Sequence, residues 1–106
     1  MHYQPKRSSA RWLEGAPAPV LACYDNGGRS IDRYVVLYGA PLWDPEMGRA
    51  VPYVAMNAAP FHPQGFGQHG EMQSCDRSAL GRKIRFHDLP PNCQRLVAQD
   101  CAKETP

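Results

Sequence analysis

The sequence has no long apolar stretch. No run of about 18 apolar residues occurs, and such a run is what a membrane-spanning helix requires. The N-terminus is polar and basic, so it also lacks the apolar segment of a secretory signal. We therefore expect a cytoplasmic protein that makes no contact with a membrane.

Catalytic motifs with an understood mechanism are also missing. The chain has no nucleophile elbow, no HExxH zinc motif, no phosphate-binding loop, no paired CxxC and no dinucleotide fingerprint. The chain has four cysteines, and in a reducing compartment they are expected as free or buried thiols or as metal ligands rather than as disulfides. These absences weigh against an enzyme without excluding one.

The length indicates one domain. At 106 residues and 11.8 kDa the chain can bury a single core, and its eleven prolines and nine glycines predict long connections. The net charge of +2 is located in residues 1–18, because the basic and acidic side chains are equal in number elsewhere. We expect a flexible basic N-terminal arm over residues 1–18 and one globular domain over residues 19–106.

Strand patterns dominate the first half of the domain. Residues 20–24 form a short apolar run, and an Asp-Asn-Gly-Gly turn connects them to a second apolar run that ends at Tyr38. Alternate residues of this second run are apolar on both faces, which is typical of a central strand covered on both sides. Residues 51–56 predict a third strand and residues 83–86 a short fourth strand.

The clearest pattern is a helix from Pro90 to Lys103. Its apolar residues recur at i, i+4, i+7, i+8 and i+12 from Leu89, which is one helical stripe. Asp88 is the candidate for its N-terminal cap. The sequence thus predicts an α+β fold, in which a small antiparallel sheet of three or four strands carries one C-terminal amphipathic helix and a long ordered loop rich in proline and glycine.

That loop, residues 60–71 (PFHPQGFGQHGE), concentrates most of the polar chemistry of the chain. Its prolines forbid a regular helix and its glycines permit close backbone approach, so we expect a loop of fixed shape. Loops on a rigid scaffold are where binding residues concentrate. The candidate binding residues are His62, Gln64, Phe66, Gln68, His69, Glu71 and, from the second strand, Arg33.

Two further kinds of site remain open. His62, His69 and Cys75 are ligand types that zinc accepts, but their spacing is unlike the tight pairs of structural zinc sites, so we expect no cofactor and keep zinc as an alternative. A histidine in this loop could also act as a general acid or base. Nucleic acid could be bound through Lys6, Arg7, Arg11, Arg82, Lys83 and Arg85, although so few charges supply little phosphate affinity.

Three segments resemble small proteins encoded in bacterial, plasmid and phage genomes. They are CYDNGGRSIDRYVVLY, NAAPFHPQGFGQHGE and GRKIRFHDLPPNCQRLV, and the resemblance covers residues 22–101. The shared features are a DNGG turn followed by DRY, the PFHPQGFGQH segment and the Asp88-Leu89-Pro90 start of the helix with Cys93. This resemblance implies a mobile genetic element as the setting, but it implies no reaction and no catalytic residue.

Taken together, these features favour a non-catalytic binding protein. Its expected partner is a protein or ribonucleoprotein, and the specific partner that we consider is a bacterial defence complex such as CRISPR-Cas, which the protein would inhibit. The first alternative is a small metal-dependent or histidine-based enzyme with its site in residues 60–71. The second is a nucleic-acid-binding accessory protein. Strand order and oligomeric state are not predicted by the sequence.

Overall fold

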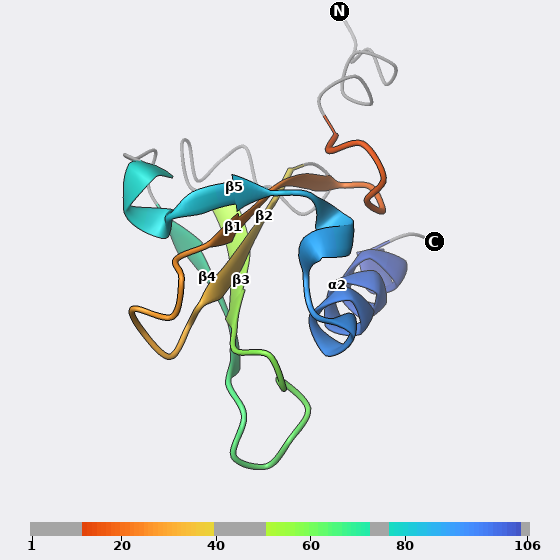
Figure 1. The fold of residues 1–106 in the computed structure, drawn as a ribbon. Coiled ribbons are helices and arrows are strands. Elements are labelled where there is room, and N and C mark those ends of the chain that lie inside the picture. The colour runs from red at the N-terminus through yellow and green to blue at the C-terminus, as the bar shows by residue number, and fades with distance from the viewer. Residues whose placement is uncertain (1–11, 40–50, 73–76, 105–106) are drawn as a thin grey trace, which may run out of the picture.

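The computed structural model describes residues 12–39, 51–72 and 77–104. In chain order its elements are β1 (Val20–Asp25), β2 (Tyr34–Tyr38), β3 (Val51–Met56), β4 (Gly67–Met72), the 3-10 helix η2 (Arg77–Leu80), β5 (Arg82–Ile84), the 3-10 helix η3 (Phe86–Asp88) and the α-helix α2 (Pro91–Glu104). The strands form one antiparallel sheet in the order β4-β3-β2-β1-β5, and α2 lies on one of its faces (Figure 1). The predicted α+β class is confirmed, with five strands instead of three or four.

Strand β2 is the centre of the sheet. All five of its residues are buried, as expected for a strand that is apolar on both faces. Tyr34, Val36 and Tyr38 belong to the core under α2, whereas Val35 and Leu37 belong to a second apolar cluster on the opposite face. The core therefore occupies both faces of the same central strand.

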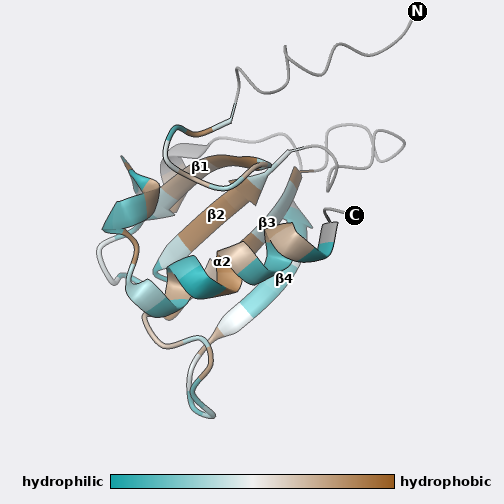
Figure 2. Ribbon diagram, turned by 90° about the vertical axis from the view of Figure 1, so that its right-hand side faces the viewer, coloured by the Kyte–Doolittle hydropathy of each residue, from teal (hydrophilic) through white to brown (hydrophobic). Residues whose placement is uncertain are grey.

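Helix α2 begins and ends within a residue of the predicted bounds. Cys93, Val97 and Cys101 are buried against the sheet, and the polar side of the helix faces solvent (Figure 2). Burying an aliphatic side chain such as that of Val97 stabilises the fold by about 1.5–3 kcal/mol. The capping role predicted for Asp88 is wrong, because its carboxylate accepts hydrogen bonds from the backbone and guanidinium of Arg85 instead. In the described residues no helix has the length and apolar character needed to cross a membrane.

A rigid turn joins β1 to β2. Gly27 and Gly28 have φ values of 80° and 91°, a region that residues with a Cβ rarely adopt. The Asn26 side chain accepts the N–H groups of Gly28 and Arg29, which closes the turn. The structure thus has a turn at the predicted Asp-Asn-Gly-Gly segment.

The predicted loop over residues 60–71 is wrong in its second half. Residues 67–71 belong to β4, which pairs with β3 from Met56↔Gly67 to Val51↔Met72. Glycine has a low strand propensity, and here the strand forms because β3 provides a partner. Figure 2 shows β4 as a pale and hydrophilic strand next to the apolar strands of the sheet.

The fourth predicted strand also has different limits. Strand β5 covers Arg82–Ile84 and pairs with β1, whereas Phe86 already begins η3. Before β1, the Leu13 N–H donates to the Val20 carbonyl oxygen at 2.8 Å, so this part of residues 12–18 lies against the domain. Lys6, Arg7 and Arg11 lie outside the described residues.

Candidate functional site

His69 is placed by the register of the sheet. One row of residues on the α2 face crosses all five strands, and every member but the last is apolar: Ile84, Cys23, Val36, Val54 and His69. Because cross-strand partners point to the same face, His69 faces the side of the sheet that α2 covers. The row thus ends in an imidazole at the edge of the sheet, beside α2.

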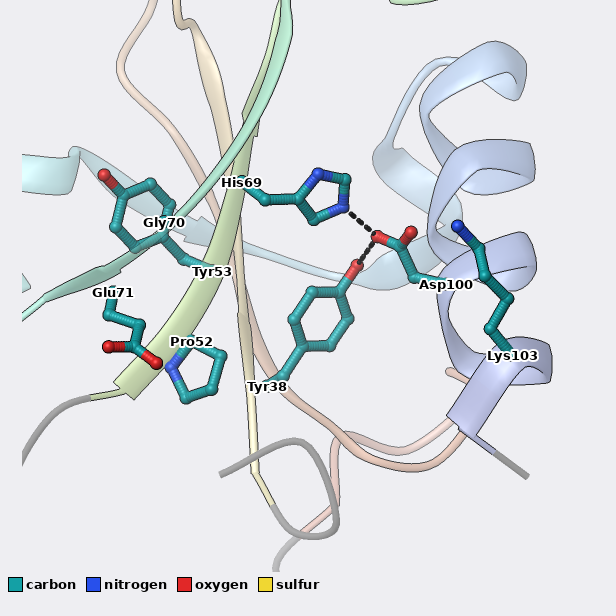
Figure 3. Close-up of a pocket in the computed structure, with 8 residues that line it drawn as sticks. All are labelled: Tyr38, Pro52, Tyr53, His69, Gly70, Glu71, Asp100 and Lys103. Carbon is teal, nitrogen blue, oxygen red and sulfur yellow. Dashed lines mark hydrogen bonds and ion pairs between the residues drawn. The ribbon is translucent and has the colours of Figure 1, made fainter. Parts of the chain in front are cut away.

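Asp100 joins this imidazole to the core. Its Oδ2 accepts a hydrogen bond from Nε2 of His69 at 2.7 Å and another from the Tyr38 hydroxyl at 2.8 Å (Figure 3). Only 11% of the Asp100 side chain is exposed, compared with 57% of the His69 side chain. A carboxylate can only accept, so Nε2 of His69 carries the proton of this hydrogen bond.

Tyr38 forms the buried end of this cluster. Burial raises the pKa of its phenol well above the usual value, and the charge of Asp100 raises it further. The hydroxyl therefore stays protonated and acts as a donor across the whole neutral range. Tyr38, Asp100 and His69 form a chain of hydrogen bonds from the core to the surface.

An open cavity of about 460 Å³ lies next to this chain. It is lined by Tyr38, Pro52, Tyr53, His69, Gly70, Glu71, Asp100 and Lys103 (Figure 3). Its walls come from three neighbouring strands and from the C-terminal part of α2, all of which are rigid elements. The lining carries carboxylates and an ammonium group, and two tyrosines and a proline supply apolar surface.

The position of Asp100 is unfavourable for the helix itself. A negative charge near the C-terminus of a helix is repelled by the partial negative charge of the macrodipole. Two hydrogen bonds compensate for this cost by joining Asp100 to the sheet. A residue that breaks a local rule in this way is a candidate for a role in function.

The loop between β3 and β4 is fixed by its own backbone, as predicted for residues 60–66. The Asn57 side chain accepts the N–H groups of Ala59 and Phe66, and Nδ1 of His62 accepts the N–H of Gln64 at 3.0 Å. The imidazole of His62 is therefore used within the loop. Phe61 is 42% exposed, and the guanidinium of Arg95, from α2, lies 4.6 Å from its ring centre.

The other predicted binding residues are spread over the molecule. Gln68 is exposed on β4 and Gln64 is exposed in the loop, while Phe66 is half-buried in the cluster on the face opposite α2. Arg33 does not reach the cavity, because its Nε lies 2.7 Å from Oδ1 of Asp25. Among the predicted binding residues, the structure brings only His69 and Glu71 to the cavity.

The described cysteines are not placed for chemistry. Cys23 and Cys93 are fully buried, and burial raises their pKa to about 12 and about 11. A thiol with so high a pKa is a poor nucleophile at neutral pH. Cys75 lies outside the described residues. In the part of the chain that the structure describes, no three His, Cys, Asp or Glu side chains come close enough to hold a metal ion.

The basic residues near β5 have carboxylate partners. Arg85 contacts Asp88 at 2.9 Å, and Arg82 lies 3.8 Å from the carboxylate of Asp25. Lys83 is exposed beside them. Charges neutralised in this way contribute less to phosphate binding, so this edge is a weak nucleic-acid surface.

Sequence reasoning missed Tyr38, Asp100 and Lys103. Tyr38 reads as an ordinary strand residue, and the other two lie among polar helix residues. The one signal in the sequence is Asp100, an acidic residue near the C-terminal end of the predicted helix. This signal does not show which strand lies next to that part of the helix. Their relation to His69 depends on the packing of α2 across β4.

Comparisons of the chain with protein-family models, with curated proteins and with solved structures gave no match.

Proposed function

We propose that the protein is a non-catalytic binding protein whose partner is another protein or a ribonucleoprotein. Its binding surface comprises strand β4 (Gly67–Met72) and the residues of β2, β3 and α2 that line the cavity beside it. We refer to this surface as the β4 surface. The observation that supports this proposal is the cavity at an exposed sheet edge, where polar side chains of β4 and α2 meet on rigid elements. Sites on rigid elements are well suited to specific recognition.

The setting that we propose is a phage or plasmid, and the partner is a bacterial defence complex such as CRISPR-Cas that the protein inhibits. This part rests on the resemblance of residues 22–101 and on the small size of the domain. An inhibitor needs only a complementary surface, which is consistent with a cavity whose described lining contains no serine or cysteine nucleophile.

A capture experiment tests the binding function. The full chain is tagged, expressed in a host bacterium and purified with its partners, which are identified by mass spectrometry. Lys103→Glu reverses a charge at the cavity, and Lys83→Glu makes the same change at the opposite edge of the sheet. We expect the first variant to lose the partner and the second to retain it. Retention of the same partner by both variants would contradict the proposed surface.

A second experiment tests inhibition of defence. Phage is plated on bacteria that carry an active CRISPR-Cas system directed against it, with and without expression of the protein. We expect more plaques when the protein is present, and fewer again with Lys103→Glu. If plaque numbers are unchanged with every type of CRISPR-Cas system, inhibition of CRISPR-Cas is excluded. The binding function is then tested by the capture experiment alone.

The contact between His69 and Asp100 favours a second candidate, a histidine-based hydrolase. Asp100 orients the imidazole at 2.7 Å, so Nδ1 could take a proton from a water molecule that attacks a substrate in the cavity. Hydrolysis of a panel of activated esters, followed for the native protein and His69→Asn, tests this candidate. A rate that falls at least about 100-fold in the variant supports general base catalysis, and turnover that is absent or independent of His69 removes it.

A further inference from the structure

The backbone of β4 has a defined open side. The Asn57 N–H donates to the Phe66 carbonyl oxygen at 2.9 Å, and these two residues are opposite each other when the register of β3 and β4 is continued. In an antiparallel pair, hydrogen-bonded and non-hydrogen-bonded residue pairs alternate. The N–H and C=O groups of Gly67, His69 and Glu71 therefore point away from β3.

Pro52 agrees with this assignment. It lies opposite Glu71, and a proline has no N–H to donate. A proline is tolerated in β3 at this position because the pair Pro52 and Glu71 needs no hydrogen bond. The backbone groups of Glu71 are thus available on the outer side, where the described part of the chain places no further strand.

The two edges of the sheet differ in their protection. Strand β5 carries the exposed Arg82 and Lys83, and such charges discourage the addition of another strand. Strand β4 has no proline, lysine or arginine, and it includes Gly67 and Gly70. The sheet therefore protects one edge by charge and leaves the other open to pairing.

The open backbone groups and the cavity are on connected surfaces. The residues whose backbone points outward, His69 and Glu71, also have their side chains at the cavity. A strand added to β4 would place the residues opposite them on the same face, because cross-strand partners share a face. Every second side chain of the added strand would then reach the cavity beside α2.

We propose that the β4 surface binds an extended segment of a partner protein by adding it to the sheet as a sixth strand. The backbone of His69 and Glu71 makes the hydrogen bonds, and the cavity receives alternate side chains of the segment. Strand addition is an established way to recognise peptides, with backbone bonds supplying affinity and pockets supplying specificity. The inference rests on the proposed binding function, and it specifies the partner as an unstructured or edge segment of a protein.

Glu71 gives this segment a charge preference. Its carboxylate has no hydrogen-bond or ion-pair partner among the described side chains. A lysine or arginine directly opposite it would form a favourable cross-strand pair. The segment should therefore carry a basic residue at the position that pairs with Glu71.

A second copy of the chain fits this edge less well. A two-fold pairing centred on His69 would place two imidazoles opposite each other and a glycine, Gly67, opposite Glu71. The cavity next to Glu71 would then receive no side chain from the second copy. A heterologous segment is the occupant that supplies both the backbone bonds and a side chain for the cavity.

The test uses a library of random linear peptides displayed on phage and selected against the full chain. The selected peptides are synthesised, and their affinity is measured by calorimetry for the native protein, Glu71→Ala and Glu71→Pro. Both variants lose the carboxylate, but only proline also removes the outward N–H. We expect the proline variant to bind about fivefold more weakly than the alanine variant, and the selected peptides to be enriched in lysine or arginine.

A second measurement leaves the protein unchanged. Single N-methyl groups are introduced along the selected peptide, and each removes one backbone donor. Methylation should weaken binding at alternate positions and have little effect between them, because only alternate N–H groups of an added strand face β4. Uniform effects, equal affinity of the alanine and proline variants, or failure to select any peptide would each overturn strand addition.

Two outcomes separate this inference from the proposed function. A partner that the Lys103→Glu variant loses, together with no strand signature in the peptide measurements, leaves the binding function intact and overturns strand addition. A dimer in sedimentation that Glu71→Pro dissociates and Glu71→Ala does not would assign the edge to a second copy, and would also overturn the inference.

Discussion

Asp100 is the residue at which the helix and the edge strand are connected. Its Oδ2 receives one donor from the buried Tyr38 and one from the exposed His69. Burial of a carboxylate is costly unless hydrogen bonds compensate for the loss of water. The two donors make the position of Asp100 tolerable and hold the wall of the cavity at a fixed distance from β4.

Removal of the Tyr38 hydroxyl should weaken this connection. We expect Tyr38→Phe to lower the free energy of unfolding by about 1–2 kcal/mol at neutral pH, because the Asp100 carboxylate loses one donor. Urea denaturation at equilibrium measures the change. Tyr24→Phe is the matched control, since Tyr24 is similarly buried but its hydroxyl has no hydrogen-bond partner among the described residues. Equal losses in the two variants would contradict a specific role for the contact with Asp100.

The free energy of unfolding should depend on pH through the carboxyl group of Asp25. The guanidinium of Arg33, 2.7 Å away, lowers the pKa of this carboxyl, and the Gly27 N–H contributes to the same shift. A lowered folded-state pKa adds stability above the unfolded pKa of about 4, and this stability is lost as the pH falls through the folded-state value. Asp25→Asn should therefore cost about 1–3 kcal/mol at pH 7.

Urea denaturation of the native protein and of Asp25→Asn between neutral and acid pH measures this contribution. The difference between the two should shrink as the pH falls below about 4. Asp32→Asn, at an exposed part of the same turn, is the control and should stay within about 0.5 kcal/mol of the native protein. A difference that is independent of pH would contradict the assignment to the Asp25 charge.

The sequence alone predicts some of the residues at the cavity and misses others, and this difference has a physical cause. His69 and Glu71 could be predicted as binding candidates because polar residues gather around them. Tyr38 and Asp100 could not, because they lie far from His69 in the sequence and only the packing of α2 on the sheet brings them together. Arg33 is likewise predicted as a binding residue together with the loop, but in the structure it pairs with Asp25.

At the scale of elements, the loop from 57 to 66 depends on one close approach. A Cβ on Gly65 would overlap the carbonyl oxygen of Ala59, which is itself held by a hydrogen bond from His62. We expect Gly65→Ala to destabilise the protein by about 1–3 kcal/mol, because the backbone has to move. Thermal or urea unfolding measures this cost, and Gln64→Ala, at an exposed neighbour, should stay near the native value. Native-like stability of Gly65→Ala would show that the loop rearranges freely.

The elements differ in how far the sequence predicts them. Helix α2 and strand β2 follow from their periodicity, since their apolar residues recur at the spacing of the element. Strand β4 lacks such a pattern, because the glycines and polar residues that make it look like a loop are those of an exposed edge. Its strand conformation comes from pairing with β3, which is a tertiary effect.

At the scale of the molecule, the sheet is asymmetric. Its centre is apolar on both faces and its β5 edge carries exposed positive charge, whereas its β4 edge combines open backbone groups with a cavity. An exposed edge without protection favours association with another chain. In the proposed function this edge is the site of binding, which accounts for the polar character of β4 and for its position next to α2.

The central claim, that β4 presents an open edge, is tested most directly by amide hydrogen exchange of the free protein, resolved by residue with NMR. The amides of Gln68 and Gly70 should exchange slowly, because they face β3 in hydrogen-bonded pairs. Those of Gly67, His69 and Glu71 should exchange rapidly, because their N–H groups point to the outer side. Slow exchange at all five residues would show that the edge is already covered, and would contradict the account.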